Sequence, residues 1–268
     1  KSTAMNMKLS FFVITVMILS ACNSSSENKQ KSKNNFIIPE EEVFQGMSLL
    51  GDSLNTKIDS VSQKSQLIKL QETEKAYLEN SSLENLIWIG RREAYLSRYD
   101  LAIRTFTKAI SEYPEAFEPY RHRGHRYISI RKFDEAIQDF NKASKLMEGA
   151  EIQIEADGMP NRLNIPLSNV QFNVWYHLGL AHYLRGDWEN ALIAYQECMK
   201  VSDNDDLKVA TLDWYYMTLK KLGRDAEAQN LIKAIKDNME IVENDAYYKR
   251  LLLYKGQLKP DDLLATEM

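Results

Sequence analysis

The sequence predicts an all-α protein in which pairs of helices repeat along the chain. Glycine and proline, which interrupt helices, number only 10 and 6 among the 268 residues. Hydrophobic residues make up 44% of the chain and charged residues 27%, as in an ordinary folded domain. Similar residues also recur every 34 positions in the middle of the chain, which is typical of stacked helix–turn–helix units. These observations favour a helical repeat protein over a turn-rich β-fold.

The N-terminal segment has the features of a secretion signal. Residues 1–4 precede the first methionine and read as upstream sequence, and Lys8 then provides a positive charge. Residues 9–21, LSFFVITVMILSA, are almost all apolar but too few to cross a bilayer, which takes ~20 residues. We therefore expect residues 1–21 to be a cleaved signal peptide.

The end of this segment, Leu19, Ser20, Ala21 and Cys22, resembles the lipobox of bacterial lipoproteins. The resemblance implies that Cys22 becomes the mature N-terminus and carries acyl chains such as palmitate, which anchor the protein to a membrane. A signal peptide followed by a chance cysteine is the alternative. Residues 23–36 are polar and low in complexity, and we expect residues 22–40 to form a flexible tether. By the same resemblance, Asn23 in place of aspartate favours the outer membrane of a bacterial cell envelope.

The repeat is carried by glycine, alanine and aromatic residues. The pairs at 34-residue spacing are Gly90 with Gly124, Tyr99 with Phe133, Ala102 with Ala136, Phe106 with Phe140, and Ala109 with Ala143. A third copy follows over 169–202, and a weaker fourth over 205–237 has Tyr216 at the usual small-residue position. Period and residue types resemble the tetratricopeptide repeat, which implies a right-handed α-solenoid of about four repeats.

The rest of the chain is organised around these repeats. We expect an N-terminal helical cap over 41–82, the solenoid over 83–237, and a C-terminal capping helix and tail over 238–268. Ser81 with Glu84, and Ser168 with Gln171, have the spacing of capping boxes at helix starts. Residues 148–168 are an insertion between the second and third repeats, and we expect it to line or close the binding groove.

The repeat resemblance places the first helix of each unit on a concave face. Arginines there would bind a carboxylate, a phosphate or an acidic peptide end. The alternative is that the arginines merely solvate a helix face. The predicted groove residues are Arg91, Arg92, Tyr95, Arg121, His125, Arg126, Asp157, Asn161, Asn164, Asn173, Tyr176, His177, Tyr183 and Asp213. Glu93 is expected to pair with Arg123 or Arg126, and Glu155 to be solvated on its loop.

Catalysis and metal binding are not expected. The chain has no Gly-rich phosphate loop, GxSxG elbow, HExxH or CxxC motif. His122, His125 and His177 are candidate zinc ligands, but the positive charge of neighbouring arginines would repel a metal ion. We therefore expect no metal and no cofactor. The net charge of −4 argues against nucleic-acid binding.

The sequence therefore predicts a membrane-anchored scaffold that binds a protein or peptide partner and is not an enzyme. The alternative is an envelope enzyme or a small-ligand-binding protein that uses the groove arginines and histidines and the insertion 148–168.

Overall fold

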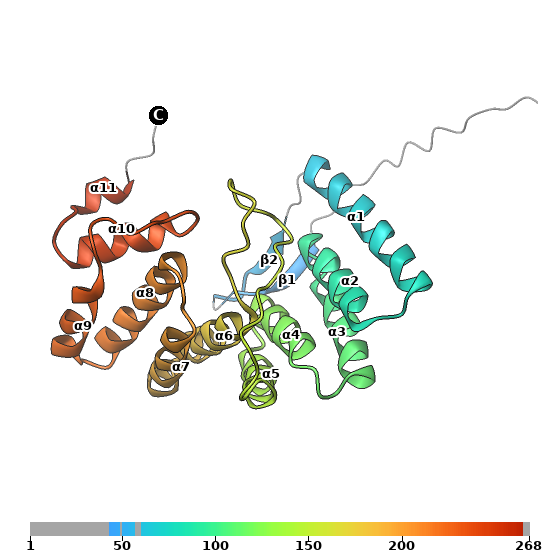
Figure 1. Ribbon diagram of the computed structural model, residues 1–268, viewed down its shortest axis with the longest axis horizontal. Helices are drawn as coiled ribbons and strands as arrows, with labels where there is room; N and C mark the ends of the chain where they lie inside the picture. Colours follow the sequence, from blue (N-terminus) through green and yellow to red (C-terminus); the bar gives the residue numbers. More distant parts are fainter. Residues whose placement is uncertain (1–42, 49, 57–59, 265–268) are drawn as a thin grey trace, which may run out of the picture. The chain divides into compact units, whose positions relative to one another are not determined.

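The computed structural model describes residues 43–48, 50–56 and 60–264 (Figure 1). The chain divides into two compact units, 1–38 and 39–268, and all described residues belong to the second. The expected signal peptide, the lipidated Cys22 and nearly all of the tether lie outside the described residues. Within the described part, no helix combines the length and apolar character needed to cross a bilayer.

The described residues form a short β-hairpin followed by a series of helices. The strands are β1 (Val43–Met47) and β2 (Ser53–Thr56). The helices are α1 (Ser60–Glu79), α2 (Leu83–Tyr95), α3 (Tyr99–Glu112), α4 (Glu118–Ser129), α5 (Phe133–Leu146), α6 (Val170–Arg185), α7 (Trp188–Lys200), α8 (Asp205–Lys221), α9 (Asp225–Leu231), the 3₁₀ turn η1 (Ile232–Ala234), α10 (Asp245–Tyr254) and α11 (Pro260–Leu264).

From α2 onward the helices pair as antiparallel neighbours, α2 with α3, α4 with α5, α6 with α7, and α8 with α9. The first helices also contact one another in series, α2 with α4, α4 with α6, and α6 with α8. These first helices therefore share one face. The prediction of an all-α solenoid of helix–turn–helix repeats is confirmed.

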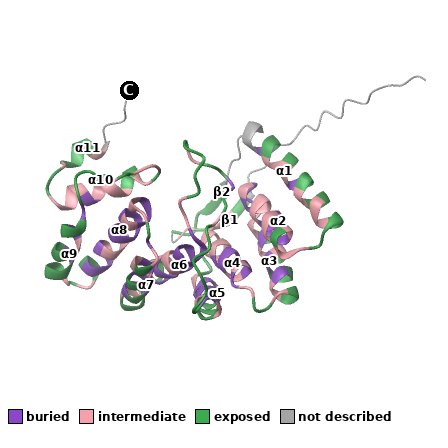
Figure 2. Ribbon diagram, viewed as in Figure 1, coloured by how far each residue is buried: buried purple, intermediate pink, exposed green. Residues whose placement is uncertain are grey.

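The small residues of the repeat explain how closely the paired helices pack. A Cβ added at Gly90 would lie 2.5 Å from the ring of Phe106, and one at Gly179 would lie 2.6 Å from the ring of Tyr195. Both rings are fully buried. Figure 2 shows buried segments along α4–α8, whereas α1 and α9 expose more of their surface. The glycines therefore make room for the aromatic residue of the partner helix.

Two helix starts differ by one residue from the predicted capping boxes. The side chain of Ser82, not Ser81, accepts a hydrogen bond from Asn85 N at the start of α2. Asn169, not Ser168, accepts from Phe172 N at 2.6 Å at the start of α6. Both residues have an extended backbone, and the side chain of each accepts a hydrogen bond from the backbone N–H three residues later, as an N-cap does.

The prediction of a helical region over 41–82 was wrong in its first part. Residues 43–56 form the antiparallel hairpin, with a bulge between Phe44 and Gly46, and only α1 is helical. Gln45 Nε2 donates to Ser97 O at 3.0 Å, so the hairpin is held against the turn between α2 and α3. Gly51, at a positive φ of 88°, allows the tight turn between the strands.

The C-terminal region contains two helices, α10 and α11, where one capping helix was predicted. α10 packs against the first helix α8. The preceding loop is held by the buried carboxylate of Asp206, which accepts backbone N–H groups from Val242, Glu243 and Asn244 at 2.8–2.9 Å. The end of the solenoid is thus covered by the chain itself.

Candidate functional site

The insertion between α5 and α6 is anchored at its base. Glu155 N donates to Ser168 O at 2.9 Å, and Val170 N donates to Gln153 O at 2.8 Å, which makes the two ends of the insertion antiparallel. The side chain of Gln171 adds two hydrogen bonds, one from Gln153 N and one to Glu151 O. The loop rising beside α4 and α6 in Figure 1 is this insertion.

The middle of the insertion is bound to the first helices α2, α4 and α6. Glu155 forms an ion pair of 3.0 Å with Arg121 of α4 and accepts a hydrogen bond of 3.0 Å from Asn173 of α6. Arg91 of α2 donates to Ala156 O at 2.8 Å. The Glu155 side chain is only 10% exposed, so the expectation of a solvated carboxylate was wrong. Three helices from three repeats therefore hold one acidic segment.

Gly158 packs directly against Tyr95 of α2. A Cβ at this position would lie 2.0 Å from the Tyr95 hydroxyl oxygen, a distance that no packing arrangement tolerates. Arg92 Nη1 donates to Gly158 O at 3.3 Å and fixes the same residue from its other side. The loop can approach α2 this closely only because residue 158 has no side chain.

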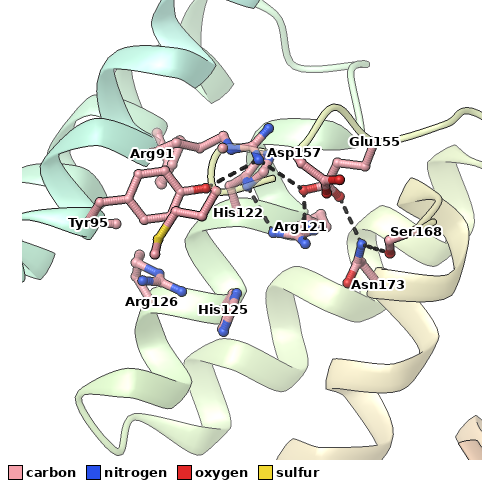
Figure 3. A pocket seen from close by; sticks show the side chains of 14 residues that line it. Arg91, Tyr95, Arg121, His122, His125, Arg126, Glu155, Asp157, Ser168 and Asn173 are labelled. Carbon is pink, nitrogen blue, oxygen red and sulfur yellow. Dashed lines mark hydrogen bonds and ion pairs between the residues drawn. The ribbon is translucent and has the colours of Figure 1, made fainter. Parts of the chain in front are cut away.

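A pocket of about 260 Å³ lies between these helices and the insertion (Figure 3). Three guanidiniums and two carboxylates give it a mixed but cationic lining, with His122 and His125 from α4. The residues that line it are Arg91, Ala94, Tyr95, Phe106, Arg121, His122, His125, Arg126, Glu155, Asp157, Gly158, Met159, Ser168 and Asn173.

Two of the arginines in the pocket are in very different states. Arg121 is 7% exposed and pairs with Glu155, while burial lowers its pKa against the opposing effect of that carboxylate. Among the described residues, the guanidinium of Arg126 has no ion pair or hydrogen bond. It makes a cation–π contact with Tyr99, whose ring centroid lies 5.2 Å from the guanidinium carbon. Burial, with the charges of Arg121 and Arg91, lowers the pKa of Arg126 to about 10. Arg126 is therefore a charged group without a counterion.

The histidines beside the pocket are uncharged at neutral pH. Burial lowers the pKa of His122 and His125 well below the usual value, and nearby arginines lower it further. His177 lies beneath His125, with ring centroids 4.1 Å apart, and burial lowers its pKa to about 3. Its Nδ1 contacts Asn173 O at 2.7 Å. The described residues contain no group of three histidine, cysteine or acidic side chains that would hold a metal ion.

The structure brings together only part of the predicted groove set. Seven of those residues line the pocket: Arg91, Tyr95, Arg121, His125, Arg126, Asp157 and Asn173. Arg92 and His177 lie behind its wall. Asn161 and Asn164 lie farther along the insertion, where the side chain of Asn161 organises a turn.

The predicted aromatic end of the groove is covered by α10. Tyr176 hydrogen-bonds through its hydroxyl to Tyr247 of α10 at 2.8 Å and accepts from Trp214 Nε1 at 2.7 Å. Tyr183 packs edge-on against Trp214, with centroids 5.2 Å apart. The prediction of Asp213 as an accessible groove residue was wrong, because its side chain is 0% exposed and paired with Arg250. Its raised pKa reflects burial, which Arg250 opposes.

The expected ion pair of Glu93 with Arg123 or Arg126 was also wrong. Glu93 accepts a hydrogen bond from Thr105 Oγ1 at 2.7 Å, within its own repeat. Arg123 instead forms two hydrogen bonds, of 2.7 and 2.8 Å, with Asp139 on the partner helix α5. Glu93 and Arg123 thus each bind a side chain of their own repeat rather than each other.

Sequence reasoning missed Gly158, Met159 and Ser168 as pocket residues and assigned no contact to Glu155. A glycine after an acidic residue in a loop between repeats indicates a turn, but not which helix the loop approaches. The relevant partners lie about 35 to 65 residues earlier in the chain, in α2 and α4. No local pattern carries that pairing.

Comparison with known proteins agrees with this geometry. Residues 172–205, which cover α7 and most of α6, match the family described as tetratricopeptide repeat. The chain carries a tetratricopeptide repeat. Proteins with such repeats generally mediate protein–protein interactions and are generally not enzymes.

Individual relatives are distant. The small glutamine-rich tetratricopeptide repeat-containing protein 2 of Saccharomyces cerevisiae is 24% identical over 163 residues, which are 61% of this chain and 40% of that protein. The chain thus spans less than half the length of the curated relative it matches.

Three solved structures are similar at low identity. The crystal structure of TTC0263, a thermophilic tetratricopeptide protein in Thermus thermophilus, has a TM-score of 0.49 at 17% identity over 69% of this chain and 89% of that one. YrrB, titled a tetratricopeptide protein with an unusual peptide-binding site, has a TM-score of 0.48 at 19% identity over 71% and 87%. MamA has a TM-score of 0.48 at 15% identity over 75% and 98%.

Proposed function

We propose that this chain is a membrane-tethered scaffold that binds a protein partner through the tip of its insertion and the adjoining face of the first helices. The observation that carries this proposal is the exposure of large apolar side chains on the insertion. Met159 is 71% exposed, Leu163 48% and Ile165 51%. Single exposed apolar residues are common on protein surfaces, but several within seven residues of one loop favour a contact surface.

The insertion tip is also ordered in advance of any contact. Asn161 Oδ1 accepts from Leu163 N at 3.0 Å and Ile165 N at 3.3 Å, while its Nδ2 donates to Ile165 O at 2.6 Å. Nδ2 also donates to Glu243 Oε1 at 2.7 Å, which joins the tip to the loop before α10. A loop fixed in this way loses less conformational entropy when a partner binds, so more of the contact energy contributes to affinity.

A protein partner fits this surface better than an extended peptide lying along the whole face. α10 covers the face at α8, and the insertion occupies it at α2 and α4. The surface left for a large partner is therefore the raised tip and its surroundings. Partner binding through the repeats is also what the family generally does.

The experiment is site-specific photocrosslinking in the native membrane fraction. A photoreactive residue replaces the exposed Arg162 in the tip, and a second chain carries it at exposed Ile193 on α7. We expect one crosslinked protein from position 162 that is not obtained from position 193.

A matched set of variants tests the apolar contact itself. Serine at Leu163 and Ile165 should abolish the crosslink from position 162. Serine at two exposed residues elsewhere, Leu78 and Ile193, should leave it intact. Equal yields from both variants would refute the tip as the partner surface.

The tether is proposed from the sequence alone, on the lipobox-like residues that end at Cys22. Radiolabelled palmitate should be incorporated by the chain in a bacterial host, and Cys22→Ser should abolish labelling. Cys198→Ser should not, because Cys198 is buried against Thr211 and burial raises its thiol pKa to about 12. Labelling that persists in Cys22→Ser would contradict the tether.

A further inference from the structure

The pocket beneath the insertion contains a buried donor that the protein does not use. Arg121 Nη1 contacts His122 Nδ1 at 2.9 Å and Nη2 contacts Glu155 at 3.0 Å, but its Nε has no partner among the described residues. The residue is 7% exposed, so bulk water does not replace the missing acceptor. Leaving a buried donor unpaired is unfavourable, and such groups are rare in folded proteins.

A cation without a counterion lies in the same pocket. Arg126 has no carboxylate within ion-pairing distance in the described part of the chain, although Arg121 and Arg91 each reach Glu155. Figure 3 shows Arg126 and His125 across the hollow from Glu155. An anionic group placed in this space would face Arg126 without displacing Glu155.

The pocket also contains a buried acceptor that lacks a donor. Asp157 Oδ2 has no hydrogen-bond partner among the described residues, and the atom is shielded from solvent. Asp157 belongs to the insertion, whereas Arg121 and Arg126 belong to α4. The three residues thus line one cavity from two sides.

We propose that this pocket binds a small organic acid that also carries a hydrogen-bond donor, an acidic amino acid or a hydroxy acid. Its carboxylate faces Arg126, and its ammonium or hydroxyl group donates to Asp157. The lining supports one net negative charge on the ligand, because Arg91, Arg121 and Arg126 outnumber Glu155 and Asp157 by one while the histidines are neutral.

The size of the pocket is compatible with a small molecule. A cavity of about 260 Å³ is near the lower limit for small-molecule sites, and Gly158 and Met159 of the insertion line it. We therefore take the ligand to be a free small molecule. This goes beyond the proposed partner surface, of which Leu163 and Ile165 do not line the pocket.

Occupancy of the pocket is coupled to the insertion. Glu155, Asp157 and Gly158 line the pocket, and residues 159–165 form the exposed tip that follows them. A ligand that binds Asp157 fixes the position of the tip, so it should strengthen partner binding by the same factor by which the partner strengthens ligand binding.

The test is calorimetric titration of the purified full chain with L-lactate, L-glutamate and L-aspartate. The matched comparator is propionate, which has the charge and size of lactate without its hydroxyl group, and inorganic phosphate is titrated separately. We expect at least one of the three acids to bind, and the analogue without the donor to bind at least about tenfold more weakly, as the loss of one hydrogen bond to a charged group implies.

Two variants from opposite walls of the pocket locate the site. Arg126→Met should weaken binding at least about tenfold, and Asp157→Ala should remove the preference for lactate over propionate. Arg104→Gln, which removes an exposed cation of α3, is the control and should bind like the wild type. Circular dichroism of each variant checks that it is folded.

The proposal is overturned if none of the three acids binds, if Arg126→Met binds as tightly as the wild type, or if phosphate alone binds. If lactate binds, equal binding of propionate also overturns it, since no donor would then be recognised. None of these results depends on the serine variants of the insertion tip, so the partner surface and the pocket are tested separately.

Discussion

Replacing Arg126 by methionine should stabilise the folded chain, although it removes a charged residue from its proposed site. Arg126 lies in α4 without a counterion among the described residues, and burial lowers its pKa from the ordinary value to about 10. Each tenfold loss of proton affinity corresponds to ~1.4 kcal/mol, so the charged form costs the fold up to ~3 kcal/mol.

Part of that cost is already offset by the ring of Tyr99. The guanidinium carbon lies 5.2 Å from the ring centroid, a cation–π contact worth ~0.5–2 kcal/mol. Methionine has a similar length and fills the same space without a charge. The net gain in the free energy of unfolding should therefore be ~1–2 kcal/mol at pH 7 in the absence of ligand.

The pH dependence has a definite sign. At pH 7 Arg126 is charged in both the folded and the unfolded chain, so the whole penalty is present. Above pH 10 the folded chain releases this proton before the unfolded chain does, so the penalty decreases as the pH rises further. The advantage of Arg126→Met should accordingly be constant from pH 6 to pH 9.

Replacing Arg123, three residues earlier, by methionine should have the opposite effect and destabilise the folded chain. Arg123 makes two short hydrogen bonds to Asp139, whose side chain is 7% exposed. Arg123→Met leaves that carboxylate buried and unpaired, and breaking a buried pair in this way costs ~3–5 kcal/mol. Replacing both members, with leucine at Asp139, should recover most of the loss.

Urea unfolding monitored by circular dichroism at pH 7 measures both effects. We expect the midpoint to rise for Arg126→Met and to fall for Arg123→Met, with similar slopes. If Arg126→Met destabilises the chain as much as Arg123→Met does, Arg126 must have a counterion in solution. The inference that Arg123 is paired and Arg126 is not would then be wrong.

Two further predictions concern the insertion and the histidines. Gly158→Ala places a Cβ 2.0 Å from the Tyr95 hydroxyl, so the insertion should dissociate from α2 at a cost of ~1–3 kcal/mol. A protease should then cleave the insertion faster than in the wild type. Adding Tyr95→Ala removes the clash and should restore protection from cleavage. An unchanged cleavage rate would show that the loop does not dock there. His177 has a pKa of about 3 when folded, so below pH 6.5 only the unfolded chain takes up its proton, and stability should fall by ~1.4 kcal/mol per pH unit for this residue. His177→Gln should reduce the measured slope between pH 6 and pH 4 by one proton, and an unchanged slope would mean that His177 is protonated in the fold.

The helical repeats follow from local sequence. Gly90 and Gly179 come 16 residues before Phe106 and Tyr195, a spacing that places glycine and ring at the same level of two antiparallel helices. Because each repeat uses the same spacing of glycine and aromatic residue, the pattern occurs several times within one chain and can be recognised without an alignment. Helix starts were displaced by one residue, since serine and asparagine neighbours compete for the same capping role.

The β-hairpin left a signal that the helical interpretation overlooked. Gly51 and Asp52 form a turn pattern after a segment that contains the apolar residues Val43, Phe44 and Met47, and a short segment with Leu54 follows them. The hairpin is held in place by Gln45 and Ser97, more than fifty residues apart in sequence, so its docking was not accessible to local reasoning.

By itself, the sequence determined the repeat, the positions of the first helices and the arginines that they carry, because these depend on spacing within about 34 residues. Only the tertiary structure decided which of those arginines has a counterion. Glu155 reaches Arg121 across the insertion, Asp139 reaches Arg123 across a helix pair, and Arg126 is left without either. Charge pairing depends on distances of 3–4 Å between segments remote in sequence, and those distances exist only once the chain has folded.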